Sequence, residues 1–219
     1  MIGQEHVPTR AERIFLLSPA YAGGRRAEMV LNDRAQFDLA KRLRNREGVS
    51  IAEAFTFLSG LYFRGKIAYA NAFARCPDGT GGVFVITPTR GLVDAHWRIR
   101  IDDLVEFAQV DIEEDDPRYR RPLGRDARRL AKKLPMACDV VLLGSIASGK
   151  YVDVLLENFG DKLYFPADFV GRGDMSRGGL MLRCAQDRQE LRYIPVACST
   201  RNGKRPPKLE PRRYPKVRA

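Results

Sequence analysis

Four short runs of apolar residues recur along the chain, and they limit its fold more than any other feature. Each run is followed by a turn or by helix-forming sequence, and the runs are RIFLLSP (13–19), GVFVITP (82–88), DVVLLGS (139–145) and KLYFP (162–166). Apolar residues are continuous in these runs rather than alternating, which is typical of strands covered on both faces. The runs therefore predict a mainly parallel sheet between two layers.

Helix-forming sequence lies between the apolar runs. Strands that alternate with helices predict an α/β fold, three-layer and Rossmann-like, with a mainly parallel central sheet. A charged block at 111–126 is expected to be a solvated loop, and 192–199 is expected to form one last edge strand. The predicted helices are 25–46, 51–60, 62–75, 125–135 and 151–160.

Length and composition favour one α/β domain at 1–199 and a tail at 200–219. Hydrophobic residues make up 44% of the 219 residues, enough for a large core. No apolar run reaches the ~20 residues of a membrane helix, and the amino terminus has no apolar signal region. We expect a soluble, cytoplasmic monomer. The four cysteines are scattered without a CxxC pair, so we expect no metal site. We expect no other cofactor either, because the hydrolysis considered below needs none.

The charge of the chain is uneven. Residues 201–218 hold eight basic residues and one acidic residue, a net charge of +7 out of +11. Four prolines in the same segment favour an extended, flexible tail rather than a helix. Such a tail suits an anionic partner, and we expect it to lie along the phosphates of DNA.

Small residues and cations follow each predicted strand. Arg25, Arg90, Lys150 and Arg172 come after the four strands in order. Ligands of open α/β sheets bind at the carboxyl ends of the strands, so these positions predict an anion-lined pocket. The residues expected to meet in one cleft are Tyr21, Arg90, Lys150 and Asp174.

The stretch 165–183, FPADFVGRGDMSRGGLMLR, is the glycine-rich loop among these strand ends. Glycines let a backbone approach a ligand closely, and Arg172 and Arg177 suit phosphate oxygens. Asp174 fits two roles equally well, a catalytic carboxylate or the N-cap of the helix that follows. Tyr62 and Tyr69 lie seven residues apart on one helical face, which is more typical of core residues than of groups that stack on a ligand.

Four segments in their order resemble the YaaA-like peroxide-stress DNA-binding proteins and related bacterial domains of unknown function. They are LLSPA (16–20), GLYFRGKIAYANAFA (60–74), ITPTRGL (86–92) and VVLLGSIASGKYVDVL (140–155). Such domains are similar to the Rossmann-like folds of DNA base-excision enzymes. A short basic protein of this type also resembles phage-defence DNA glycosylases that remove glucosylated hydroxymethylcytosine.

The sequence leads to one preferred function and two alternatives. The preferred function is a DNA glycosylase in anti-phage defence, which flips a modified base out of duplex DNA and hydrolyses its N-glycosidic bond. The alternatives are a non-catalytic DNA-binding protein and a hydrolase of nucleotides or sugar phosphates. Asp174, Lys150 and Arg90 are the predicted catalytic residues. The predicted base pocket consists of Ser18, Tyr21, Tyr62, Tyr69, Asn71 and Thr87. The predicted DNA contacts are Arg25, Arg26, Arg64, Ser145, Gly171, Arg172, Gly173, Ser176, Arg177, Arg201, Lys204 and Arg205.

Overall fold

A six-stranded sheet forms the centre of the computed structural model, which describes residues 12–201 and 203–211. The strand order is β4-β3-β1-β6-β7-β8, with β3, β1, β6 and β7 parallel and the two edge strands antiparallel. The four parallel strands are the four predicted apolar runs. The strands are β1 (Arg13–Leu17), β3 (Val83–Ile86), β4 (Leu92–Asp94), β6 (Asp139–Leu143), β7 (Leu163–Pro166) and β8 (Tyr193–Pro195).

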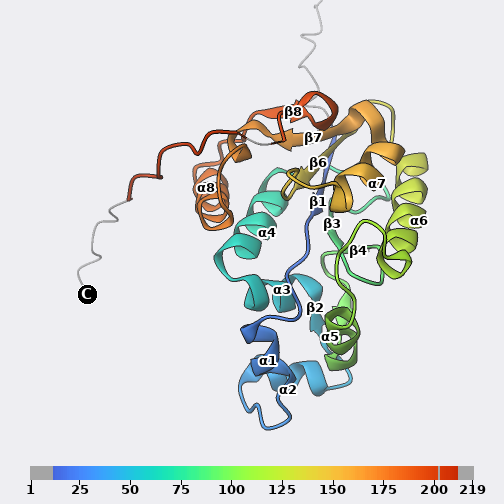
Figure 1. Ribbon diagram of the computed structural model, residues 1–219, viewed down its shortest axis with the longest axis vertical. Helices are drawn as coiled ribbons and strands as arrows, with labels where there is room; N and C mark the ends of the chain where they lie inside the picture. The colour runs from blue at the N-terminus through green and yellow to red at the C-terminus, as the bar shows by residue number, and fades with distance from the viewer. Residues whose placement is uncertain (1–11, 202, 212–219) are drawn as a thin grey trace, which may run out of the picture.

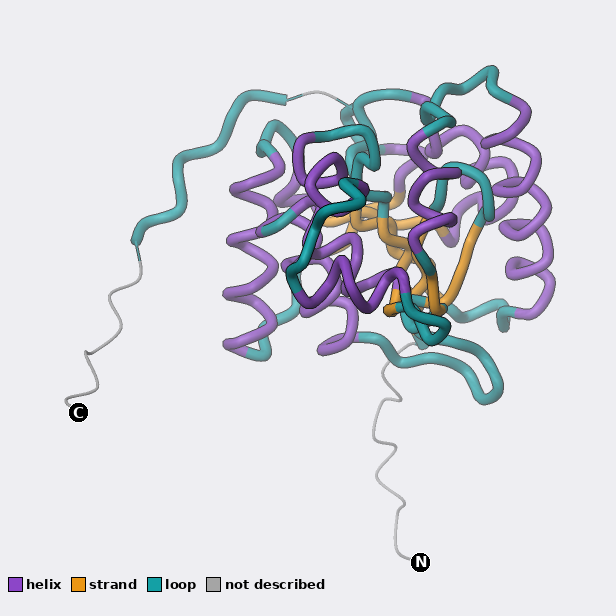
Figure 2. The backbone as a smooth tube through the Cα atoms, turned by 90° about the horizontal axis from the view of Figure 1, so that it is seen from below, coloured by secondary structure: helices purple, strands orange, loops and turns teal. Residues whose placement is uncertain are grey.

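Helices cover both faces of this sheet (Figures 1 and 2). Helices α4 (Leu61–Phe73) and α8 (Asp174–Asp187) pack together on one face, and α6 (Pro117–Lys133) and α7 (Gly149–Phe159) pack together on the other. Strand β1 lies in the middle, and the side chains of Ile14 to Leu17 are fully buried. The prediction of an α/β fold with a mostly parallel sheet is confirmed.

A small lobe lies beyond the carboxyl end of β1, in the lower part of Figure 1. It contains α1 (Arg25–Leu31), α2 (Asp38–Arg44), α3 (Ile51–Ser59), α5 (Ile101–Ala108) and a two-stranded sheet of β2 (Val49–Ser50) and β5 (Arg98–Ile99). The lobe therefore covers the sheet edge where a ligand is expected. Three short 3₁₀ turns complete the described elements, namely η1 (Gly160–Lys162), η2 (Ala167–Phe169) and η3 (Val196–Cys198).

Two sequence predictions about helices are wrong. The single helix expected at 25–46 is two helices, because the Asn32 side chain accepts a hydrogen bond from the Arg34 N–H and starts a turn. The charged block at 111–126 is a loop only as far as Asp116. There the Asp116 carboxylate caps the Arg118 N–H, and Pro117 begins α6 at a position that suits proline.

Two glycines let α4 and α8 touch through their backbones. A Cβ atom on Gly65 would lie 2.6 Å from the Gly178 carbonyl oxygen, and one on Gly178 would lie 2.7 Å from the Leu61 carbonyl oxygen. The close approach makes Lys66 of α4 and Arg177 of α8, the chain neighbours of these glycines, two buried cations in adjoining helices.

The described tail residues, 203–211, form no helix or strand. They lie against α8, where Arg183 donates a hydrogen bond of 2.6 Å to the Glu210 carbonyl oxygen. Gly171 has a φ of 67° and leaves room for the backbone of Lys204. Residues 212–219, which carry the other cations of the predicted DNA-binding tail, lie outside the described residues.

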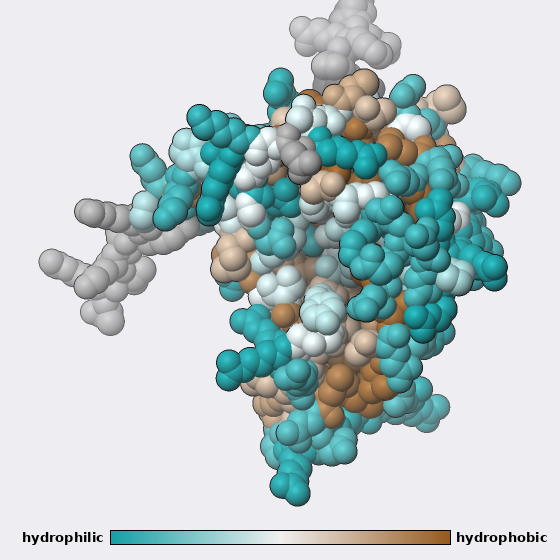
Figure 3. Space-filling view, viewed as in Figure 1, coloured by the Kyte–Doolittle hydropathy of each residue, from teal (hydrophilic) through white to brown (hydrophobic). Residues whose placement is uncertain are grey.

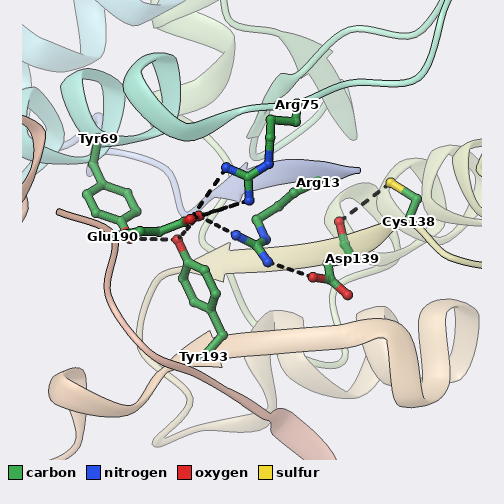
Figure 4. A network of polar contacts seen from close by, with 7 residues as sticks. All are labelled: Arg13, Tyr69, Arg75, Cys138, Asp139, Glu190 and Tyr193. Carbon is green, nitrogen blue, oxygen red and sulfur yellow. Dashed lines mark hydrogen bonds and ion pairs between the residues drawn. The ribbon is translucent and has the colours of Figure 1, made fainter. Parts of the chain in front are cut away.

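A polar cluster joins the amino ends of β1 and β6 (Figure 4), and we call Arg13, Tyr69, Arg75, Asp139, Glu190 and Tyr193 the amino-end cluster. Arg13 donates to Asp139 at 2.8 Å and also to Glu190, which Arg75 approaches to 3.3 Å. The Tyr193 hydroxyl lies 3.1 Å from Glu190 and 2.6 Å from the Tyr69 hydroxyl. Two cations thus face two carboxylates, and the cluster ties the end of α8 to the sheet.

Candidate functional site

The strand order places a candidate site between β1 and β6. From β1 the chain first crosses to β3 on one side and later returns to β6 on the other side. Loops that leave β1 and β6 at their carboxyl ends therefore diverge, and ligands of open α/β sheets bind at such a switch point. Ser18 follows β1 at this position, and Ser145 follows β6.

A cleft of about 440 Å³ opens at the carboxyl ends of β1 and β3, beside the start of α7. Its walls come from the loops after β1 and β3, the end of α5 with the loop that follows, and the start of α7. Most lining residues are apolar, and Tyr21 at 71% exposure is the most open aromatic residue among them. The cleft therefore suits a flat ligand with a few polar contacts. Residues that line it include Pro19, Tyr21, Pro88, Phe107, Lys150 and Tyr151.

A buried lysine lies at the carboxyl end of β1. Lys66 is 1% exposed, and its Nζ donates hydrogen bonds of 2.6 Å to the Ser18 hydroxyl and 2.9 Å to the Ser18 carbonyl oxygen. The same ammonium lies 3.9 Å from the centre of the Tyr62 ring. Burial lowers the pKa of Lys66 to about 7, although Asp174 acts in the opposite direction. The Lys66 side chain therefore changes between its charged and neutral forms near neutral pH.

Two buried tyrosines connect Lys66 with its surroundings. Burial raises the pKa of Tyr62, and its hydroxyl makes no hydrogen bond with any residue in the described part of the chain. Burial also raises the pKa of Tyr151, and contact with the Ser18 hydroxyl opposes that effect. Because Tyr151 also lines the cleft, it links the cleft to Ser18 and Lys66.

Asp174 and Arg177 form an ion pair of 3.5 Å at the start of α8. The Arg177 guanidinium is buried and donates hydrogen bonds of 2.9 and 3.2 Å to the Phe169 carbonyl oxygen. Asp174 is the first residue of the helix, and the N-cap is Gly173, without a side-chain cap. The Asp174 side chain is 65% exposed, so its carboxylate is available to a ligand.

These side chains influence one another and form a second polar cluster. The charges of Asp174 and Arg177 act on the pKa values of Tyr62, Lys66 and Tyr151, so all five lie close together. The dipole of α8 favours a negative charge at its first residue, where Asp174 lies. We call Ser18, Tyr62, Lys66, Tyr151, Asp174 and Arg177 the carboxyl-end cluster.

Arg90 and Lys150, two of the predicted catalytic residues, are both paired with acidic side chains. Lys150 lines the cleft and donates a hydrogen bond of 2.6 Å to Glu113. Arg90 binds Glu106 and lies 3.7 Å from Asp103. Neither Arg90 nor Asp174 lines the cleft beside Tyr21 and Lys150, so the four residues do not share its walls.

The other predicted base-pocket residues divide between the cluster and the core. Ser18 and Tyr62 belong to the carboxyl-end cluster. Thr87 is buried, and its hydroxyl donates to the Gly91 carbonyl oxygen at 3.0 Å, which holds the turn after β3. Tyr69 is a core residue of the amino-end cluster, and Asn71 is exposed on α4.

The residues predicted to contact DNA fall into two groups. Some are exposed, and others already donate hydrogen bonds to nearby groups of the protein. Arg172 donates to the Asp168 carbonyl oxygen and to the Ser176 hydroxyl, and Arg26 donates to the Phe57 carbonyl oxygen. Arg172, Ser176, Arg205 and Lys208 line a groove of about 260 Å³ between α8 and the tail. Arg201 pairs with Asp153 at 3.2 Å. The exposed remainder comprises Arg25, Arg64, Gly173 and Lys204, whereas Gly171 and Ser145 are partly buried.

Sequence reasoning missed Lys66 and Tyr151. A signal for Lys66 is present in the sequence, because Tyr62, Lys66, Tyr69 and Phe73 follow the helical spacing of one buried face. A lysine inside such an apolar face predicts a buried ammonium group. Tyr151 carries no comparable signal, because its role depends on the packing of α7 against the end of β1.

Comparison of the chain with models of protein families, with curated proteins and with solved structures gives no match. Within residues 12–201 and 203–211, no group of three or more histidine, cysteine, aspartate or glutamate side chains is arranged to hold a metal ion. No helix in the same residues is long and apolar enough to cross a membrane.

Proposed function

We propose that this protein is a DNA N-glycosylase that excises a modified base. The observation that carries the proposal is the cleft at the carboxyl end of β1, which Tyr151 joins to a cluster with one exposed carboxylate. A base inside a duplex is out of reach, so it must be flipped into a pocket. A cleft lined by both apolar and polar groups, with Tyr21 at 71% exposure, suits a flat base that stacks on an aromatic ring.

The cluster offers the charges that this reaction needs. The C1′–N bond breaks, its electron pair leaves with the base, water adds its oxygen to C1′, and the proton that this water loses ends on the base. Positive charge develops on the sugar, and in the proposed reaction the Asp174 carboxylate stabilises it. Arg177 holds Asp174 in place through its ion pair. Tyr151, on the wall of the cleft, is the hydroxyl best placed to donate to the departing base.

The resemblance to YaaA-like proteins and to phage-defence glycosylases supports the proposal from the sequence. Through it we propose a Rossmann-like fold and a role in anti-phage defence, with glucosylated hydroxymethylcytosine as the first base to test. Arg90 does not belong to the proposed catalytic group, because Glu106 and Asp103 neutralise it. Lys150 keeps a place at the cleft, paired with Glu113.

The experiment incubates the purified protein with genomic DNAs that carry different base modifications and counts the abasic sites with an aldehyde-reactive probe. Abasic sites on at least one modified DNA are expected, with none on unmodified DNA. A matched pair of variants identifies the carboxylate, because Asp174 and the exposed Asp168 lie in the same loop region. Asp174→Asn should lower the number of abasic sites formed in a fixed time by about 10²–10³-fold, and Asp168→Asn should retain it. DNA binding without abasic sites on any DNA would refute the proposal.

A second candidate is a DNA-binding protein without chemistry. The specific observation in its favour is the cationic surface of α6 and the tail, which needs no cleft to bind phosphates. The two candidates differ in what Asp174→Asn does. A purely binding protein keeps its cellular effect in this variant, whereas a glycosylase loses it while DNA binding persists.

A further inference from the structure

One helix carries most of the positive charge of the folded body. Helix α6 holds eight basic residues and one acidic residue, a net charge of +7. Residues 1–200 together carry +4, so the body outside α6 has a net charge of −3. The excess of positive charge in this protein is therefore confined to α6 and the tail.

The cations of α6 line a groove of about 530 Å³ between α6 and α7, and Figure 3 shows a mainly hydrophilic surface over this side of the molecule. The one acidic side chain that lines the groove is Glu157, which pairs with Arg120 at 2.7 Å. Four other cations in the groove make no hydrogen bond or ion pair with the described part of the chain, and they are Arg121, Arg128, Arg129 and Lys132.

Repulsion between these cations destabilises helix α6. Arg121 and Arg125, Arg125 and Arg129, and Arg128 and Lys132 are pairs of like charges four residues apart. Such pairs repel one another on a helix surface and destabilise it. A polyanion in the groove would remove this repulsion, so the charges fit a bound state better than the free protein.

The groove and the cleft are both lined by α7. Helix α7 lines the cleft with Lys150 and Tyr151 at its start and lines the groove with Val154 and Asn158 further along. From Arg121 to Lys132 the helical rise is about 16 Å, which matches the axial length of about five base pairs. The tail and α8 lie on the opposite face of the sheet (Figure 1), so cations flank the cleft on both sides.

We propose that the α6–α7 groove binds the phosphate backbone of duplex DNA beside the nucleotide that enters the cleft. The choice of duplex DNA over other polyanions rests on the proposed function. Arg121, Arg128 and Lys132 contact successive phosphates of one strand, and they carry no sequence information. The groove then fixes the register of the duplex on the protein, and the cleft selects the base.

The experiment measures binding of a fluorescent, unmodified duplex DNA by anisotropy over a salt titration. The test variant is Arg121→Gln/Arg128→Gln/Lys132→Gln in the full chain. The matched control is Arg34→Gln/Lys41→Gln/Arg46→Gln, which removes the same charge from exposed residues around α2. The test variant should bind more weakly, and its slope of log K against log salt should fall by about 2.7, or about 0.9 for each phosphate that is no longer neutralised. The control should keep both values close to those of the wild type.

The outcomes separate this proposal from the proposed function. Equal affinity and equal slope in the two variants would overturn the groove as a DNA site. The same titration is run with a duplex RNA of equal length. If the test variant binds this RNA more weakly than the wild type does but binds duplex DNA equally well, the occupant is RNA and the proposal is overturned. The anisotropy titration measures binding only and does not depend on base excision. Its result therefore stands even if the protein forms no abasic sites. Circular dichroism melting of both variants confirms that weaker binding does not come from unfolding.

Discussion

The two polar clusters at the ends of β1 differ in how their charges are balanced. In the amino-end cluster, Arg13 and Arg75 face Asp139 and Glu190, and every one of these charges has an opposite partner (Figure 4). In the carboxyl-end cluster, Lys66 and Arg177 face one carboxylate, Asp174, which is mostly exposed. The first cluster is neutral and closed, whereas the second is positive and open on one side.

From this difference we propose that the amino-end cluster holds the fold together and that the carboxyl-end cluster takes part in binding a ligand. Buried charges are stable when they are paired with opposite charges, as Arg13 and Arg75 are at the amino end, where only the Arg13 Nε–H lacks a hydrogen-bond partner among the described residues. At the carboxyl end the Tyr62 hydroxyl has no hydrogen-bond partner among the described residues, and burial lowers the pKa of Lys66 to about 7. Such costs are typical of functional sites, where a bound group completes the contacts.

The largest expected effect is that of Asp174→Asn on base excision. The amide keeps the shape of the side chain and removes the charge that stabilises the developing cation, so we expect excision to fall by about 10²–10³-fold. Single-turnover rates on a modified duplex give the size of the effect. Glu190→Gln in the amino-end cluster is the counterpart and should leave the rate of the folded protein unchanged. Similar excision rates for the wild type and Asp174→Asn would show that the carboxyl-end cluster does not catalyse excision.

Glu190→Gln should instead lower stability. The change leaves Arg13 and Arg75 short of one counter-charge in a partly buried setting, with Glu190 26% exposed. We expect a loss of about 2–3 kcal/mol in the free energy of unfolding, below that of a fully buried pair. Urea denaturation measures it, and Asp174→Asn should change the same quantity by less than about 1 kcal/mol because the Asp174 carboxylate is 65% exposed and the buried Arg177 keeps its hydrogen bonds to the Phe169 carbonyl oxygen. The reverse ranking would contradict the assignment of the two clusters.

Lys66 should make stability depend on pH. Its pKa is 10.5 in the unfolded chain and about 7 in the folded protein, so between these values only the unfolded chain holds the proton. The free energy of unfolding should therefore rise with pH over this window, by up to about 1.4 kcal/mol per pH unit, and should not respond to this group below about pH 7. Denaturation at several pH values should show that Lys66→Met removes this rise. The exposed Lys41→Met should retain it.

Two tyrosine variants are expected to show the smallest change in stability, and they compare the two clusters directly. Tyr69→Phe removes a hydroxyl that contacts Tyr193 at 2.6 Å and accepts the Leu191 N–H at 2.8 Å, which should cost about 1–2 kcal/mol. Tyr62→Phe removes a hydroxyl that has no partner among the described residues, and it should leave stability unchanged or raise it by up to about 1 kcal/mol. Thermal unfolding of the two variants side by side checks the sign. Equal destabilisation would mean that both hydroxyls are structural.

The sheet was predictable because its signal is local. Each parallel strand is a continuous apolar run, so neighbouring residues alone indicate burial on both faces. Short elements such as β4 and the eight-residue α5 have no comparable signal and were not predicted. The start of α6 was predictable in principle from Asp116 and Pro117, but the surrounding charges favoured a loop.

The site was predictable only where position along a strand was enough. Ser18, Asp174 and Arg177 follow strands, and the structure brings them together. Arg90 also follows a strand, yet Glu106 of α5 neutralises its charge. No local sequence pattern predicts this ion pair, because the two residues lie in different elements. Which strand-end cations stay open to a ligand is thus decided by tertiary packing.

The backbone contact between Gly65 and Gly178 also bears on how the cleft can move. Helices that touch without intervening side chains have little room to slide, so α4 and α8 should shift as one piece. Lys66, Arg177 and Asp174 travel with that piece. A motion that admits a bulky ligand would have to come from the opposite wall, where the loop between α5 and α6 joins the lobe. We therefore expect the carboxyl-end cluster to keep its geometry when a ligand enters, and the lobe to be the part that moves.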